Sequence, residues 1–99
     1  MTGIARCVRA GSRQLREVGR FDAPEARQGV AVDANFIYVV DSTIIAKYDK
    51  KTHKLVQLND GPPEGALIHL DSGVVVDGKL YCAHSNYPGI PMTSSVEIW

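Results

Sequence analysis

The chain carries the same β-rich pattern twice. Residues 29–33 read GVAVD, and residues 73–77 read GVVVD, 44 residues further along. Two more β-rich runs follow in each copy, at 36–41 and 44–49 in the first copy and at 79–84 and 95–99 in the second. Branched and aromatic side chains favour strands, and short strands that recur at one period predict a repeat architecture rather than a single continuous sheet.

The residues that follow the two short apolar runs are typical of tight turns. Asp77-Gly78 predicts a two-residue hairpin, because a type I′ turn needs positive φ at both central positions. We expect Asp33 and Asp77 to occupy equivalent turn positions and to accept hydrogen bonds from backbone N–H groups downstream. The apolar runs themselves, 30–32 and 74–76, predict inner strands that are covered on both faces.

A repeat of roughly 40–45 residues with several short strands is typical of β-propeller blades. We therefore predict an all-β fold of about two four-stranded antiparallel blades, the second of them truncated. Residues 1–21 form a basic N-terminal segment with an outer strand at 14–21, residues 22–60 form the first blade, and residues 61–99 form the incomplete second blade. Two blades cannot close a ring, so the remaining blades are expected from a longer chain or from self-association.

The first copy has the most specific pattern. It combines GVAVD at 29–33, IYVVD at 37–41 and IAKYD at 45–49, followed by a polar turn. This pattern resembles one blade of the NHL and YVTN-type propellers, a group that includes the gluconolactonase-like and strictosidine-synthase-like enzymes. The resemblance covers about residues 20–99, with His53 where such blades often carry glycine. It implies a six-bladed ring, a fold that binding proteins, sensors and hydrolases share.

Candidate binding residues gather in two segments that this topology places at one end of the ring. These are the segment 68–72, expected as the connection that leads into the second inner strand, and the long loop 84–94. The candidate ligand-binding residues are His69, Asp71, His84, Asn86 and Tyr87. Of these, His69, Asp71 and His84 are the metal candidates, because imidazole and carboxylate groups bind divalent ions. The alternative is that both histidines are hydrogen-bonded residues that hold the loop in place.

The function predicted from these features is a scaffold that binds a ligand or a protein. No complete catalytic set can be assigned, so we name no catalytic residue and no resident cofactor. The alternative is part of a metal-dependent lactonase-like or hydrolase-like propeller enzyme, for which a divalent cation at the metal candidates would be needed.

Charge and hydropathy argue against two classes of partner. The 99 residues include 11 Lys and Arg and 11 Asp and Glu, so the chain lacks a net field to attract nucleic acid or an anionic membrane. No apolar run approaches the ~20 residues of a membrane helix, and residues 1–9 lack the apolar stretch of a secretory signal. We predict a soluble protein of unknown compartment, with Cys7 and Cys82 not spaced for metal or redox chemistry.

Overall fold

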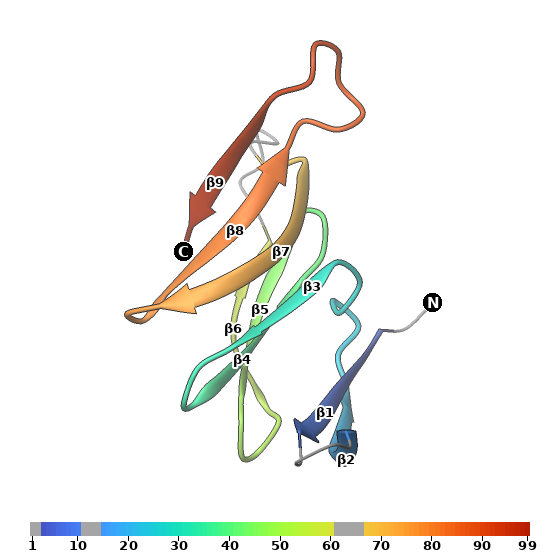
Figure 1. The fold of residues 1–99 in the computed structure, drawn as a ribbon, viewed down its shortest axis with the longest axis vertical. Coiled ribbons are helices and arrows are strands. Elements are labelled where there is room, and N and C mark those ends of the chain that lie inside the picture. Colours follow the sequence, from blue (N-terminus) through green and yellow to red (C-terminus); the bar gives the residue numbers. More distant parts are fainter. Residues whose placement is uncertain (1–2, 11–14, 61–66) are drawn as a thin grey trace.

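The computed structural model describes residues 3–10, 15–60 and 67–99, which form three antiparallel sheets (Figure 1). The described residues contain nine strands and no helix, so the all-β prediction is confirmed. A hairpin contains β1 (Ile4–Ala10) and β2 (Leu15–Asp22). A four-stranded sheet contains β3 (Gly29–Val32), β4 (Phe36–Val40), β5 (Ile45–Asp49) and β6 (Leu55–Asn59). A three-stranded sheet contains β7 (His69–Val76), β8 (Lys79–Ser85) and β9 (Ser94–Ile98).

Strand order follows chain order in every sheet, so each strand pairs with the one before it. The strand expected at 14–21 is β2, but its partner β1 was not predicted. The segment 68–72 was expected as a loop, and this is wrong, because β7 begins at His69 and pairs with β8 from that residue. The polar residues Asp71 and Ser72 lie at a bulge between Leu70 and Gly73, while Leu70 itself is fully buried. The predicted boundary between the blades, at residues 60 and 61, borders residues outside the described ranges.

The pairing register shows that the first two strands of each copy repeat with a period of 43 residues. This is one residue fewer than the 44 that separate GVAVD from GVVVD in the sequence. Val32 on β3 pairs with Ile37 on β4, and Val75 on β7 pairs with Leu80 on β8. Both members of the second pair lie 43 positions beyond their counterparts. Because side chains alternate between the faces of a strand, this difference of one residue exchanges which side chains face inward.

The two aspartates therefore do not occupy equivalent turn positions, and that prediction is wrong. Asp33 accepts hydrogen bonds from the backbone N–H groups of Asn35 and Phe36, both at 2.7 Å, as expected for that residue. Asp77, one position further along its turn, has a φ of 50°, and Gly78 has a φ of 76°. Positive φ at both residues confirms the two-residue turn predicted from Asp-Gly.

The middle of the four-stranded sheet is covered on both faces, because successive side chains of β4 point in opposite directions and all of Ile37–Val40 are buried. One face packs on the three-stranded sheet through a cluster that contains Ala31, Tyr38, Val40, Ile45, Leu70, Leu80 and Cys82. The other packs on the hairpin through Ala5, Ala23, Ile37, Val39, Ala46 and Tyr48. Cys82 is a buried free thiol, whereas the side chain of Cys7 is outside the described part of the structure.

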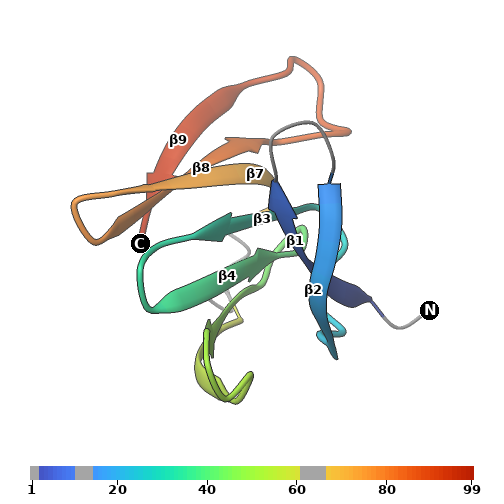
Figure 2. The ribbon, with the colours of Figure 1, turned by 60° about the horizontal axis from the view of Figure 1, so that its bottom comes forward.

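The inner strands β3 and β7 lie side by side, and the hairpin strands run across the direction of β3 and β4 (Figure 2). The backbone N–H of Leu70 donates to the Ser42 carbonyl oxygen at 2.8 Å. A Cβ atom at Gly29 would lie 2.9 Å from the Cα of Ser72. Glycine at this position therefore permits the close approach of the two sheets.

Among the described residues, the three-stranded sheet is covered on one face only. Its other face, which we call the open face, carries the apolar residues Val74, Val76, Tyr81, Ala83, Val96 and Ile98, with Lys79, Ser85 and Ser94 at its ends, all of which the register places on the same side. Val74 and Val76 are 58% and 50% exposed, and Val30 and Val32 on β3 are 57% and 55% exposed. The prediction that both inner strands are covered on both faces is therefore wrong for this chain.

Candidate functional site

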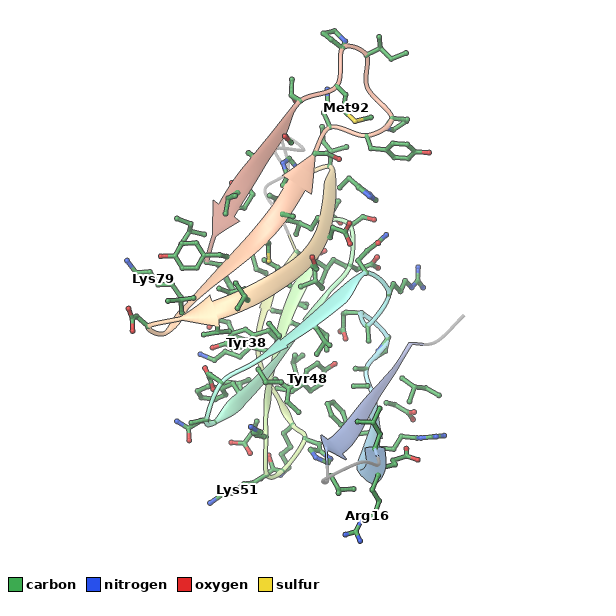
Figure 3. All side chains as sticks on the ribbon, viewed as in Figure 1. Arg16, Tyr38, Tyr48, Lys51, Lys79 and Met92 are labelled. Carbon is green, nitrogen blue, oxygen red and sulfur yellow. The ribbon has the colours of Figure 1, made fainter. Side chains whose placement is uncertain are left out.

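The loop between β8 and β9 covers residues 86–93, which is shorter than the predicted 84–94 because His84 and Ser85 pair with β9. It lies at one end of the long axis of the molecule. Figure 3 shows Met92 at this end and Arg16 and Lys51 at the opposite end. The loop therefore projects beyond the sheets.

Asn86 holds this loop together through both its backbone and its side chain. Its backbone N–H donates to the Thr93 carbonyl at 3.2 Å, and its carbonyl accepts from the Gly89 N–H at 2.6 Å. Its side-chain amide donates to the Pro91 carbonyl at 3.0 Å, and its side-chain oxygen accepts from the Thr93 N–H at 2.7 Å. The candidate ligand-binding residue Asn86 is thus engaged in organising the loop.

The organised loop presents apolar side chains to solvent. Ile90 is 96% exposed, Met92 is 63% exposed and Tyr87 is 56% exposed. Tyr87 also contacts His69, with ring centroids 5.4 Å apart and planes inclined at 47°. The structure therefore brings two of the five candidate residues, His69 and Tyr87, into direct contact, while Asp71 is exposed on the bulged part of β7.

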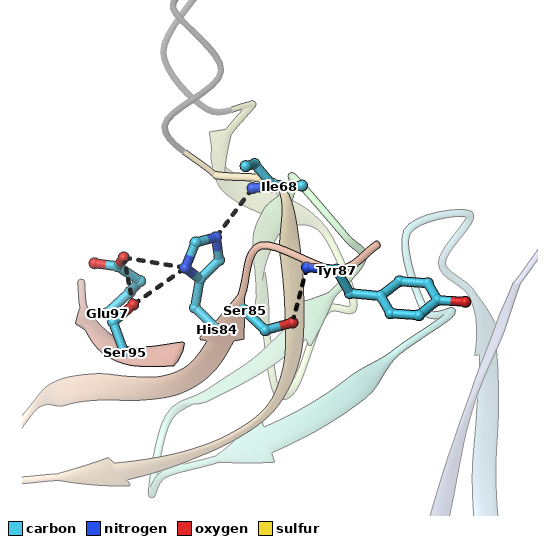
Figure 4. Close-up of polar contacts among 6 residues, drawn as sticks. All are labelled: Ile68, His84, Ser85, Tyr87, Ser95 and Glu97. Atoms are coloured by element: carbon cyan, nitrogen blue, oxygen red, sulfur yellow. Dashed lines mark hydrogen bonds and ion pairs between the residues drawn. The ribbon is translucent and has the colours of Figure 1, made fainter. Parts of the chain in front are cut away.

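His84 is bound by neighbours at both ring nitrogens (Figure 4). The Ile68 N–H donates to Nε2 at 3.0 Å, and Nδ1 lies 3.1 Å from Ser95 Oγ and 3.4 Å from Glu97 Oε1. Because Nε2 accepts, the proton of the neutral imidazole lies on Nδ1, where it is donated to Ser95. Ser95 in turn donates to the Glu97 carboxylate at 3.1 Å.

This arrangement leaves neither nitrogen of His84 open to a metal ion or a substrate proton. The described residues contain no group of three His, Cys, Asp or Glu side chains that could hold a metal ion. The contacts of His84 are those expected for the alternative in which the histidine holds the loop and its flanking strands in place.

A cleft between the hairpin and β3 is a second candidate site, which was not predicted because β1 was not predicted. Its volume is about 890 Å³. Its walls are mainly apolar and include Ile4, Ala5, Val18, Phe21, Val30, Val32, Ile37 and Val39. Arg27, Lys50 and His53 also line it, and the described residues of its lining include no carboxylate side chain. The alternation of apolar and polar residues in β2 was the available sequence signal.

Electrostatic shifts occur away from the loop. The Tyr48 hydroxyl donates to Glu25 Oε2 at 2.7 Å, and burial together with this contact raises the pKa of Tyr48 to about 12. Burial acts to raise the pKa of Asp33, but hydrogen bonds from Asn35, Phe36 and Tyr38 outweigh burial and lower it. Both groups support turns that connect strands, and neither belongs to loop 86–93.

No helix among the described residues is long and apolar enough to cross a membrane. Comparison with known proteins found no matching family model, no matching curated protein and no matching solved structure.

Proposed function

We propose that this chain consists of β-propeller blades of the six-bladed type and acts as a binding scaffold without chemistry of its own. Three features support the blade assignment. The sheet β3–β6 is antiparallel with its strands in chain order, the next sheet starts again beside β3, and the register repeats every 43 residues. These features are typical of radially repeated sheets that pack face to face.

We place the binding surface on loop 86–93, and the observation that carries this proposal is the exposure of Ile90, Met92 and Tyr87 on a loop that Asn86 already holds in one conformation. Exposed apolar side chains that gather on one surface mark interaction sites. A loop that is ordered before binding loses little conformational entropy when its partner arrives. The partner that fits is a protein or peptide with an apolar patch.

The test is a peptide-binding selection with a matched loop variant. A random peptide library is selected on the wild-type chain, and the affinity of each enriched peptide is measured by calorimetry. We expect enriched peptides to be rich in apolar residues and to bind Ile90→Asp at least about tenfold more weakly, as for a central interface residue. Lys51→Ala, at the other end of the molecule, is the control and should bind normally.

Two results would contradict the proposal. One is that no peptide is enriched on the wild-type chain. The other is that enriched peptides bind Ile90→Asp and the wild type with equal affinity, because the binding surface would then lie elsewhere.

A further inference from the structure

Two apolar strand surfaces remain open on opposite sides of the packed sheets. One is the surface of β3 that carries Val30 and Val32, and the other is the surface of β7 that carries Val74 and Val76. Val30 and Val32 belong to the face that packs on the hairpin, since they pair with residues of that face. Val74 and Val76 belong to the open face.

The register relates these two surfaces to a contact that already exists within the molecule. With a period of 43 residues, Val74 corresponds to Ala31, which is buried against the three-stranded sheet. Val32 corresponds to Val75, which packs in the same cluster from the other side. The open surface of β7 is thus the counterpart of the covered surface of β3, and the open surface of β3 is the counterpart of the covered surface of β7.

The open surface of β7 and the open surface of β3 are therefore complementary to each other in the same way as the two surfaces that meet within the molecule. We propose that copies of this chain associate head to tail, with the open face at Val74 and Val76 of one copy packed against Val30 and Val32 of the next. Such an interface uses a different surface on each partner, so it produces a ring or a filament rather than a symmetric pair. This proposal goes beyond loop recognition and uses none of the loop residues.

The cleft beside β3 supports this choice of partner. The hairpin covers Ile37 and Val39 and leaves a space of about 890 Å³ along Val30 and Val32. The described lining of this space includes no carboxylate side chain, and the one charged residue that the register places on the open face, Lys79, lies at the turn between β7 and β8. An apolar strand can therefore enter without an acidic group being buried unpaired.

The test compares the wild-type chain with two variants that each introduce a negative charge, Val32→Glu and Val76→Glu. The solution mass of each protein is measured by light scattering over a range of concentrations. We expect the wild-type mass to rise above the 10.8 kDa of one chain as concentration increases. Each variant alone should remain a monomer, because every contact would include one altered surface. An equimolar mixture should form a dimer of one chain of each kind and nothing larger, since each chain retains one intact surface.

Ile90→Ser is the control, and it should associate like the wild type because the loop takes no part in this contact. The association contact and the loop share no residue, so either proposal can be contradicted while the other is supported. If circular dichroism shows that the glutamate variants do not fold, Val32→Thr and Val76→Thr keep the shape of the side chain and should weaken association about tenfold, because each buries a hydroxyl without a partner.

Several results would overturn the proposal. A wild-type chain that stays monomeric at every concentration would show that the two surfaces do not bind each other. Association that persists in both variants would place the interface elsewhere. A mixture of folded variants that fails to form the dimer would show that β3 and β7 do not meet between copies.

Discussion

His84 illustrates how the contacts of a single side chain decide between two interpretations of a sequence. From sequence, His84 is a candidate metal ligand or a residue that holds the long loop. In the structure its ring lies between the Ile68 N–H and the Ser95 hydroxyl, and its side chain is only 10% exposed. Both nitrogens serve neighbours, which favours the structural role.

We predict that His84→Ala lowers the free energy of unfolding by about 1–3 kcal/mol, because it leaves the Ile68 backbone donor without its acceptor and removes the contact with the Ser95 hydroxyl. Urea denaturation of both proteins measures this difference. Divalent zinc or manganese should leave the melting temperature of the wild type unchanged. A cation-dependent increase that His84→Ala abolishes would instead support the metal-site hypothesis, since a ligand of the native state must stabilise it.

Tyr48 makes the stability of the fold depend on pH in the alkaline range. Its pKa of about 12 lies above the ordinary value of 10, because burial and then the Glu25 carboxylate disfavour the tyrosinate. The raised pKa contributes stability that is fully present below pH 10 and is lost as the pH rises through about 12.

We predict that Tyr48→Phe removes this part of the pH dependence. Stability of wild type and variant should differ in slope between pH 10 and about 12, as measured by urea denaturation at several pH values. The ultraviolet difference spectrum of tyrosinate between the two proteins assigns the titration to Tyr48 rather than to Tyr38, whose pKa is also raised, by burial and by Asp33. Equal slopes in both proteins would contradict the assignment.

The turn between β5 and β6 shows an element held by its own polar groups. Asp49 accepts hydrogen bonds at 2.8 Å from the backbone N–H groups of Lys51 and Thr52, and these contacts lower the pKa of its carboxyl. His53 follows with a φ of 60°, a conformation that favours glycine. Its ring stacks on Phe21, with centroids 4.4 Å apart, and so connects the turn to the hairpin.

Two opposing effects at His53 lead to a prediction. A residue other than glycine in this conformation costs about 1–2 kcal/mol, whereas an aromatic pair contributes about 0.5–1.5 kcal/mol. His53→Gly should therefore leave stability nearly unchanged, because it loses the stacking contact and removes the backbone cost. His53→Ala loses the contact and keeps the cost, so it should be about 1 kcal/mol less stable than His53→Gly by chemical denaturation. Equal stability of the two variants would argue against the left-handed conformation.

The whole molecule is a stack of sheets rather than one closed core. Its radius of gyration is 14.3 Å, above the ~13 Å of a compact domain of this length. Among the described residues, only the middle sheet has other elements packed on both of its faces, the hairpin on one side and the three-stranded sheet on the other. Large apolar faces are rarely left in water, and the proposed head-to-tail contact would cover a surface that no single element of the described chain covers.

Local sequence determined the strands and turns whose partners lie close in the chain. The branched and aromatic run of β4 and the Asp-Gly pair after Val76 specify a strand and a two-residue turn through short-range preferences. The hydrogen bonds of Asp33 are likewise local, since they reach only two and three residues along the chain. These features were predicted correctly because they need no distant partner.

Tertiary structure decided which surfaces are covered and what the candidate residues contact. β1 becomes a strand by pairing with β2, and β7 extends back to His69 because Leu70 is buried between the sheets. The shift from 44 to 43 residues places Val74 rather than Val75 on the open face, a difference that inner-strand composition does not reveal. The faces of a strand alternate with a period of two, so only the pairing partner determines which of them meets solvent.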